Sequence, residues 1–393
     1  MFRPRIRVQL GLATCLVAVV TVLGLVVLWP RGEVDNLAEA TRGIDYVDAD
    51  VRSIGLIDCD DPFEGLPTQC QSVEVSITSG PTDGSSVTFL SSAVDFGAPL
   101  FAVGDRVVLA YNRLAPPEFR YVFVEFQREL PLLLLGGAFV VVVVAFGRWK
   151  GVRALAGLAL SMAVIVGFLL PSLLRDNNAV AVALVTTSVV AFVALYLTHG
   201  VSMVSTVALL GTLSSVLLIT ALAAFVTAAS ELSGISGEAF QLLRVTAEAV
   251  DPRGILIAGI VIGALGVLDD VTVTQVSAVE ELRRANPGLD RRDLYRSAIR
   301  IGRDHVASTV NTLVLAYVGS SLALMLFFLQ EGRSVSQVLG REVVAIEIVR
   351  TLVGSIGLIV SVPLTTALAV VAVDALPSAL AKPISRSSRS GGE

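Results

Sequence analysis

The stretch Gly254-Ile-Leu-Ile-Ala-Gly-Ile-Val-Ile-Gly-Ala-Leu-Gly-Val-Leu-Asp-Asp270 decides the fold of this chain. It carries no charge until two adjacent aspartates end it. This is typical of a transmembrane helix, because about 20 apolar residues span a hydrocarbon core of about 30 Å. At ~100° per residue, one stripe of such a helix collects small and polar side chains. Its members are Gly259, Gly263, Gly266, Asp270, Thr274 and Ser277. We therefore expect the glycines to pack against another helix and Asp270 to point into the bundle.

Further apolar runs elsewhere in the chain also have the length of a membrane span. With the run 254–278, they are 8–30, 131–147, 152–171, 178–198, 202–229, 306–329 and 347–374. The 393-residue chain is 54% hydrophobic and 16% charged, and its mean hydropathy is +0.77. A water-soluble fold cannot hide so much apolar surface, because its own exterior must face water. The sequence therefore predicts a polytopic α-helical membrane protein with about eight transmembrane helices.

Basic residues predict the orientation of these spans, because Lys and Arg gather on the cytoplasmic side of a membrane. With eight spans, four basic stretches fall on one face: 3–7, 147–153, 283–303 and the tail 377–393. We expect a first helix at 1–30 that is retained, since its apolar run is long for a signal peptide. A seven-helix bundle over 129–376 follows, with both termini cytoplasmic in the plasma membrane of a bacterium.

The charge of the chain limits the kinds of partner that it is expected to bind. A net charge of −5 gives no reason to expect nucleic acid. The basic cytoplasmic loop 283–303 is a candidate contact for anionic lipid, although the rules of membrane topology explain its arginines equally well. The lipid bilayer is therefore the one partner that the whole sequence predicts.

The segment 31–128 is the long polar stretch of the sequence, and we expect it to lie outside the membrane as a small β-rich domain of barrel or sandwich type. Apolar and polar residues alternate over 73–78, and the turn Gly-Pro-Thr-Asp-Gly at 80–84 precedes a second strand, which predicts a β-hairpin. In an oxidising compartment, Cys59 and Cys70 are expected to form a disulfide worth about 3 kcal/mol. Two free thiols are the alternative.

Polar side chains also enter the span 306–329. Asp304, Ser308 and Asn311 share one helical face there, at a depth that suits contact with Asp270 and Thr274. A carboxylate among hydroxyl and amide groups is suited to carry a proton or an ion along this pathway. It is equally suited to act as a static hydrogen-bond clamp between two helices.

The last span carries a charge pair and two glycines. Glu347 and Arg350 are three residues apart, so they are spaced to pair with each other near the outer surface. Gly354 and Gly357 follow on the same stripe and are spaced for close helix packing.

Enzymatic chemistry finds no support in the sequence. The two histidines, His199 and His305, are expected at the inner face, whereas the Gly-x-Ser-Gly string at 234–237 falls in an outer loop. A serine–histidine pair is therefore not expected. Ligands for a zinc site and a phosphate-binding Gly-x-x-x-x-Gly-Lys motif are also missing. We expect neither an enzyme nor a bound metal or cofactor.

Along nearly its whole length, the chain resembles the YibE/F-like family of multi-pass membrane proteins. The motifs are 254–270 and Ile301-Gly-Arg-Asp-His-Val-Ala-Ser-Thr-Val-Asn-Thr-Leu-Val-Leu-Ala-Tyr-Val-Gly319, with His199-Gly200 and 350–363. In the family pattern a single aspartate follows the glycines; Asp270 is the matching position, and Asp269 departs from the pattern. The resemblance implies a membrane protein without an established activity. The helix pair from Asp270 to Gly319 is also similar, more weakly, to that of SecD and SecF, which are driven by proton flow.

Two functions therefore remain open. The first is a proton- or ion-coupled membrane transporter that uses Asp270 as its carrier within the bundle. The alternative is a non-transporting factor for envelope assembly, or a scaffold, that acts through the outer β-rich domain.

Overall fold

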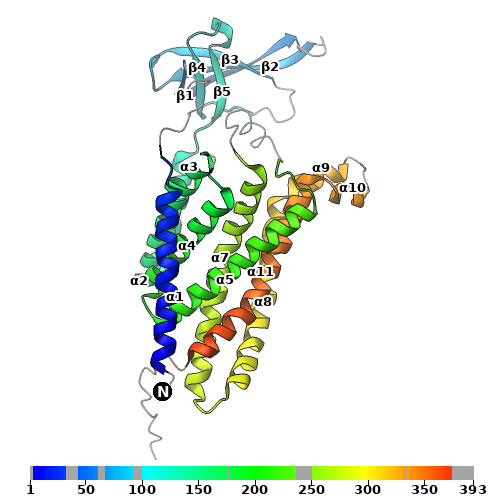
Figure 1. The fold of residues 1–393 in the computed structure, drawn as a ribbon. Helices are drawn as coiled ribbons and strands as arrows, with labels where there is room; N and C mark the ends of the chain where they lie inside the picture. The colour runs from blue at the N-terminus through cyan, green and yellow to red at the C-terminus, as the bar shows by residue number, and fades with distance from the viewer. Residues whose placement is uncertain are drawn as a thin grey trace, which may run out of the picture. The chain divides into compact units, whose positions relative to one another are not determined.

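The computed structural model describes residues 3–31, 43–60, 67–92, 100–175, 177–235, 250–330, 332 and 334–373. The chain divides into two compact units. A helical unit comprises Met1–Val34 and Phe146–Glu393, and a smaller unit comprises Asp35–Ala145. The described residues are mostly helical, and the strands lie in the smaller unit (Figure 1).

The smaller unit contains one antiparallel sheet of five strands, in the order β3-β2-β1-β4-β5. The strands are β1 (Ile44–Asp60), β2 (Pro67–Ile77), β3 (Ser86–Ser92), β4 (Arg106–Asn112) and β5 (Tyr121–Phe126), and the 3-10 helix η1 (Pro117–Phe119) precedes the last of them. The prediction of a small β-rich segment after the first helix is thus confirmed.

Alternation of apolar and polar residues gives this sheet one buried face. Val73, Val75 and Ile77 of β2 are fully buried, and Val73 lies opposite Phe89 of β3. The β2–β3 hairpin is the one that the sequence predicts. Gly80 lies in its turn with φ +86°, and a Cβ there would come within 2.7 Å of a methyl carbon of Val47. Only glycine fits this position without strain.

The predicted disulfide falls partly outside the described residues. The register of β1 and β2 places Cys59 opposite Thr68 and Cys70 opposite Ile57, which makes the two cysteines diagonal neighbours. Cys70 is disulfide-bonded, whereas the side chain of Cys59 is outside the described part of the chain. The pairing of Cys59 with Cys70 therefore stays a prediction.

Long apolar helices account for most of the larger unit, and the part of α2 up to Ala145 belongs to the smaller unit. In chain order the helices are α1 (Arg3–Val27), α2 (Glu129–Val164), the π-helix η2 (Ile165–Leu169), α3 (Leu170–Leu173), α4 (Ala179–His199), α5 (Met203–Ala229), α7 (Pro252–Ala285), α8 (Arg291–Ser320), α9 (Leu322–Gln330), α10 (Val335–Leu339) and α11 (Glu342–Ala372). Among the described residues, six helical segments are long and apolar enough to cross a membrane, and a seventh is added if α8 and α9, bent by 58°, form one span. The chain is therefore a multi-pass membrane protein.

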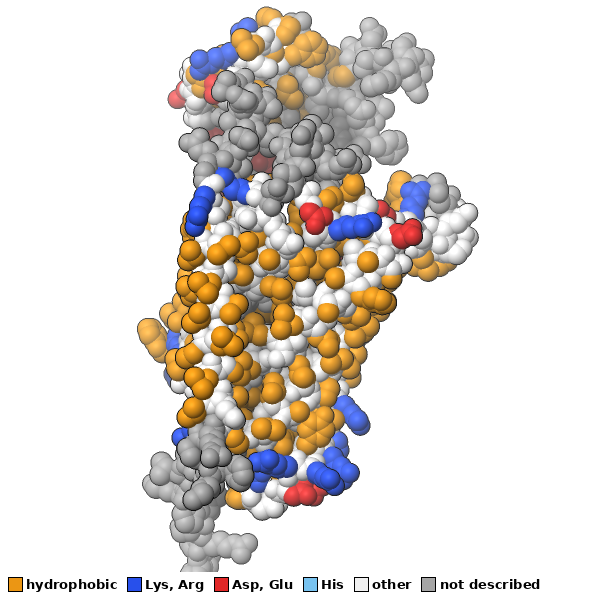
Figure 2. All heavy atoms as spheres, viewed as in Figure 1, with side chains coloured by type: hydrophobic (Ala, Val, Ile, Leu, Met, Phe, Trp, Pro, Cys, Tyr) orange, Lys and Arg blue, Asp and Glu red, His pale blue; other side chains and the backbone are white. Residues whose placement is uncertain are grey.

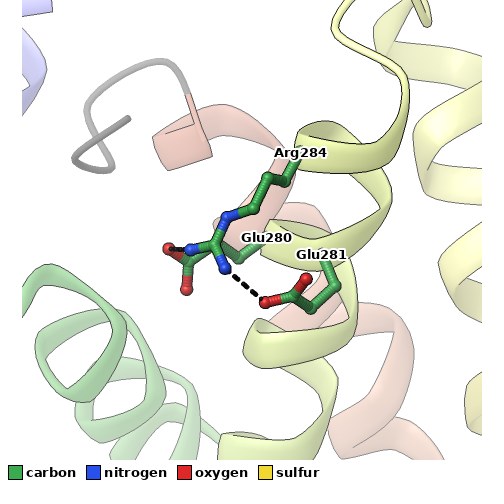
Figure 3. A network of polar contacts seen from close by, with 3 residues as sticks. All are labelled: Glu280, Glu281 and Arg284. Carbon is green, nitrogen blue, oxygen red and sulfur yellow. Dashed lines mark hydrogen bonds and ion pairs between the residues drawn. The ribbon is translucent and has the colours of Figure 1, made fainter. Parts of the chain in front are cut away.

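Helix α7 is the centre of the helical unit, where it packs against α4, α5, α8 and α11 (Figure 1). Its bulky residues, such as Ile260 and Leu268, are fully buried. Asp251 begins the helix by accepting a hydrogen bond from the Arg253 amide, ahead of a proline at the first position. The last turns extend past the apolar part, where Arg284 bonds to both Glu280 and Glu281 at 3.0 and 2.7 Å (Figure 3).

Small residues let the neighbours of α7 approach one another closely. A Cβ at Gly357 of α11 would come within 2.1 Å of Ile219 of α5, and a Cβ at Gly211 of α5 would come within 2.6 Å of the Thr365 hydroxyl of α11. Glu342, the first residue of α11, accepts hydrogen bonds from the amides of Ser233 and Gly234 at 2.7 and 2.8 Å. These contacts fix α11 against α5 and against the segment that follows α5.

The surface of the helical unit is divided by chemistry. On the face shown in Figure 2, hydrophobic side chains cover most of its middle, while most of the Lys, Arg and acidic side chains gather toward its two ends. Charged side chains are costly in hydrocarbon, by roughly 3 kcal/mol each at mid-depth. An apolar middle between charged ends is therefore typical of a bundle that lies in a bilayer. We call the end at which α4 finishes the His199 end.

Candidate functional site

The two adjacent aspartates of α7 face in different directions. The Asp270 side chain is 74% exposed. Oδ1 of Asp269, by contrast, is enclosed and has no hydrogen-bond partner among the described residues. The prediction that Asp270 points into the bundle is therefore wrong, and Asp269 is the carboxylate that faces inward.

The prediction failed because the glycine stripe of α7 is not its packed side. Gly259, Gly263 and Gly266 are exposed with Asp270, and a Cβ added at Gly259 or Gly266 would have no neighbour within 4 Å. Because α7 is central, its bulky residues cover the sides that meet α4, α5 and α11. The stripe of small residues is the side that remains uncovered.

Asp269 lies in the wall of a cavity between α2, α4 and α7. The cavity has a volume of about 320 Å³. Its walls are largely apolar, with small or hydroxyl-bearing residues from each helix: Gly157 and Ser161 from α2, Ala194 and Thr198 from α4, and Gly266 from α7. Asp269 is the ionisable side chain of the lining, so any charge that enters meets this carboxylate.

Asp269 lies toward the His199 end of the cavity. Arg153 of α2 crosses to the last turn of α4, where its Nε donates to the Leu197 carbonyl at 2.6 Å. A cation at this position stabilises the carboxyl end of a helix, whose last carbonyls lack partners within the helix. The next residues of α4 are Thr198, which lines the cavity, and His199, which is exposed.

Both histidines of the chain lie around Asp270. Nε2 of His305, from α8, is 3.9 Å from Oδ2 of Asp270. His199, from the end of α4, is within electrostatic range of Asp270, Arg153 and Lys150. Helices that are far apart in the sequence thus bring the His305 imidazole next to this carboxylate, with His199 within its electrostatic range.

The other predicted pathway residues do not converge on either aspartate. Asp304, Ser308 and Asn311 are exposed on α8, and Thr274 is exposed on α7. Among the described contacts, Asp270 meets His305 rather than Asn311. The prediction therefore chose the correct neighbouring helix, α8, but the wrong residue on that helix.

The residues of the last span behave differently. Arg350 donates to Glu347 at 2.7 Å, the pairing that their spacing predicts. Gly354 and Gly357 are buried, and Gly357 lies against Ile219. These residues hold α11 in place and lie outside the cavity lining.

Sequence reasoning missed Asp269, Arg153 and both histidines as members of this site. A signal existed for the histidines: each lies at the predicted inner end of a span, level with the aspartates. No comparable signal distinguished Asp269 from Asp270. Among the described residues, no three His, Cys, Asp or Glu side chains form a group that could hold a metal ion.

Long apolar helices define a polytopic α-helical membrane protein. The family model of the YibE/F-like protein matches residues 135–375, more than half of the chain, so the chain belongs to the YibE/F-like family. No curated protein and no solved structure matches the chain. The local likeness to SecD and SecF gains no support from these comparisons.

Proposed function

We propose that this YibE/F-like protein is a proton- or ion-coupled transporter in which Asp269 binds the coupling proton or cation. The observation that carries this proposal is the enclosed Oδ1 of Asp269 in the wall of the cavity. An ionised carboxylate without a partner is unstable in an apolar environment, so it favours binding a proton or a cation. Purified protein in liposomes, under an imposed pH gradient, tests the proposal.

The cavity has the features that binding and release require. Its volume is at the lower end of the range for ligand-binding pockets, and it is lined by hydroxyls from Ser161 and Thr198 beside the carboxylate. Gly157 of α2 and Gly266 of α7 add little side-chain bulk to its walls. Such walls favour relative movement of α2, α4 and α7 as the site is filled and emptied.

We also propose that α2 contains two membrane spans, which gives eight in total. Arg148 interrupts the helix with φ 49° and ψ −132°. The parts 129–147 and 149–173 are about 28 and 37 Å long at 1.5 Å per residue, and each suffices for a bilayer. Within the second part, Arg153 contacts Leu197 at the His199 end, whereas Ser172 bonds to Leu28 at the far end of α1. This part therefore crosses the unit by itself.

With eight spans, both termini lie on the same side of the membrane. We place them on the cytoplasmic side of a bacterial plasma membrane, together with the His199 end. Labelling of single cysteines by an impermeant reagent tests this topology. We expect Lys150→Cys to react from the cytoplasmic side alone and Arg128→Cys from the opposite side alone, with Arg284→Cys as the cytoplasmic control. A single span over 129–173 would bury Lys150 in the bilayer, and failure of Lys150→Cys to react from either side would contradict the proposal.

Anionic lipid is a proposed partner at the His199 end. Arg296, Arg300 and Arg303 of α8 line an open pocket of about 620 Å³, with Asp293 as the acidic residue of its lining. Clustered arginines next to a membrane favour anionic head groups by about 1 kcal/mol each. Substituting the three arginines by Gln is expected to lower co-purified phosphatidylglycerol, measured by lipid mass spectrometry. Unchanged retention relative to the wild type would contradict this role.

A second candidate function is favoured by the sheet unit. The face of the sheet opposite its core exposes Tyr46, Leu90, Val122 and Val124. Exposed apolar patches often mark surfaces that bind other proteins. A factor that assists envelope assembly through this sheet is therefore the alternative to transport, and neither function requires enzymatic chemistry.

A further inference from the structure

We propose that Asp270, His199 and His305 form the route by which protons pass between the aqueous phase at the His199 end and Asp269. This inference rests on the proposed transport function and adds to it a side of entry and three residues. These side chains do not line the cavity itself. They lie beside the one carboxylate that does.

The geometry begins with Asp270. Its Oδ2 is 3.9 Å from Nε2 of His305, a distance that one small movement or one water molecule closes. His199 approaches from α4 within electrostatic range of the same carboxylate. The chain has two histidines in 393 residues, and both lie here. Imidazole is the side chain that exchanges protons most readily near neutral pH.

Exposure separates the two aspartates into different roles. Asp270 is 74% exposed and His305 is 36% exposed, so both groups are open to the surroundings of the helical unit. Oδ1 of Asp269 is enclosed. Adjacent residues on a helix point ~100° apart, so one helix presents one carboxylate to water and the next carboxylate to the cavity. A proton therefore passes across α7 over the length of two neighbouring side chains.

Charged groups on α2, α7 and α8 surround this cluster. Arg153 and Lys150 of α2 are within electrostatic range of His199, and Asp269 adjoins Asp270 on α7. On α8, Arg300, Arg303 and Asp304 precede His305, whereas Met203–Ala229 of α5 and the part of α11 after Arg350 contain no ionisable residue. We place the two histidines and Asp270, rather than Asp304, on the route to Asp269, because Asp270 adjoins Asp269 and its Oδ2 is 3.9 Å from Nε2 of His305.

The proton moves in a sequence of exchanges, and each relay group returns to its starting form. A neutral imidazole of His199 or His305 takes a proton from water at the His199 end and becomes an imidazolium. The imidazolium gives this proton to the Asp270 carboxylate and returns to its neutral form. The Asp270 carboxyl group then passes the proton, through water, to the Asp269 carboxylate, and Asp270 is ionised again.

Histidine-selective ¹⁵N NMR of the purified full chain tests whether the cluster exists, independently of transport. Because there are two histidines, two imidazole spin systems are expected, and His199→Gln and His305→Gln assign them. Asp270→Asn should move both signals. Thr274→Ala, one turn further along the same exposed stripe, is the matched control and should move neither. Unmoved signals in Asp270→Asn would overturn the inference.

Proton flux in proteoliposomes supplies the second readout. We expect Asp270→Asn, and the double variant His199→Gln/His305→Gln, to slow flux on the order of 100-fold near neutral pH. Lowering the pH at the His199 end should restore their rates, which a purely structural role would not do. Asp269→Asn should stay inactive at every pH.

The outcomes distinguish this inference from the proposed function. If Asp269→Asn is inactive while the Asp270 and histidine variants keep the wild-type rate and pH profile, the relay is overturned and Asp269 remains the carrier. If Asp269→Asn transports like the wild type, both the carrier and a route that leads to it are overturned.

Discussion

Asp269→Asn is expected to abolish pH-gradient-driven flux in proteoliposomes, with a loss of two orders of magnitude or more. The amide has nearly the shape of the carboxylate, but it neither takes up a proton near neutral pH nor neutralises a cation. Because Oδ1 of Asp269 has no hydrogen-bond partner among the described residues, the substitution breaks no structural contact of that atom. Flux is measured with a pH-sensitive dye trapped inside the liposomes, and the melting temperature of the variant checks its fold.

Three controls make this result specific. Asp270→Asn should be slowed yet recover at low pH, Thr274→Ala should match the wild type, and Ser161→Ala should alter the apparent affinity of the site. Full activity in Asp269→Asn would contradict the proposed mechanism. Absence of flux in the wild type would favour the second candidate function. In that case, deletion of 34–125 should abolish the activity of the protein in cells.

Gly302→Ala is expected to destabilise the helical unit by about 2 kcal/mol. Gly302 of α8 lies where α7, α8 and α11 meet. A Cβ there would come within 2.5 Å of Val362 and 2.7 Å of the Gln275 side-chain oxygen. Gln275 is buried, and its amide donates to the Ala298 carbonyl at 2.9 Å and to the Thr366 hydroxyl at 2.8 Å. Moving this amide breaks buried hydrogen bonds, which are expensive to leave unmade.

Thermal unfolding in detergent, followed by circular dichroism, measures this effect. Gly259→Ala is the matched control, because a Cβ there meets nothing within 4 Å and alanine favours helix more than glycine does. We expect its melting temperature to equal or exceed that of the wild type. Equal melting temperatures for Gly302→Ala and the wild type would show that this junction has room to adjust.

Local sequence predicted the elements of the fold well. The alternation over 73–78 predicts the β2–β3 hairpin, since one face of a strand must be apolar to pack. Apolar runs predict α4 and α5 nearly to their ends, whereas α7 extends past the predicted 254–278 to Ala285 and α11 begins at Glu342, before the predicted 347. Glu347 and Arg350 pair as their spacing predicts, because neighbours on one helix need no tertiary information to meet.

The candidate site was predicted only in part. The sequence indicated that carboxylates at the end of the run 254–270 are functional, because charge in a membrane helix is costly. It did not indicate which of Asp269 and Asp270 is enclosed. The periodicity of a helix fixes the angle between two side chains but not the direction in which either one points.

By itself, the sequence determined that this protein is a membrane-embedded helical bundle with a small sheet, since apolar length and alternation are properties of each segment alone. Only the tertiary structure decided that Asp269 faces the cavity and that Asp270 meets His305. The neighbours of α7 cover its bulky sides and leave its glycine stripe open. Enclosure depends on which helices lie alongside, and that arrangement is a property of the whole bundle.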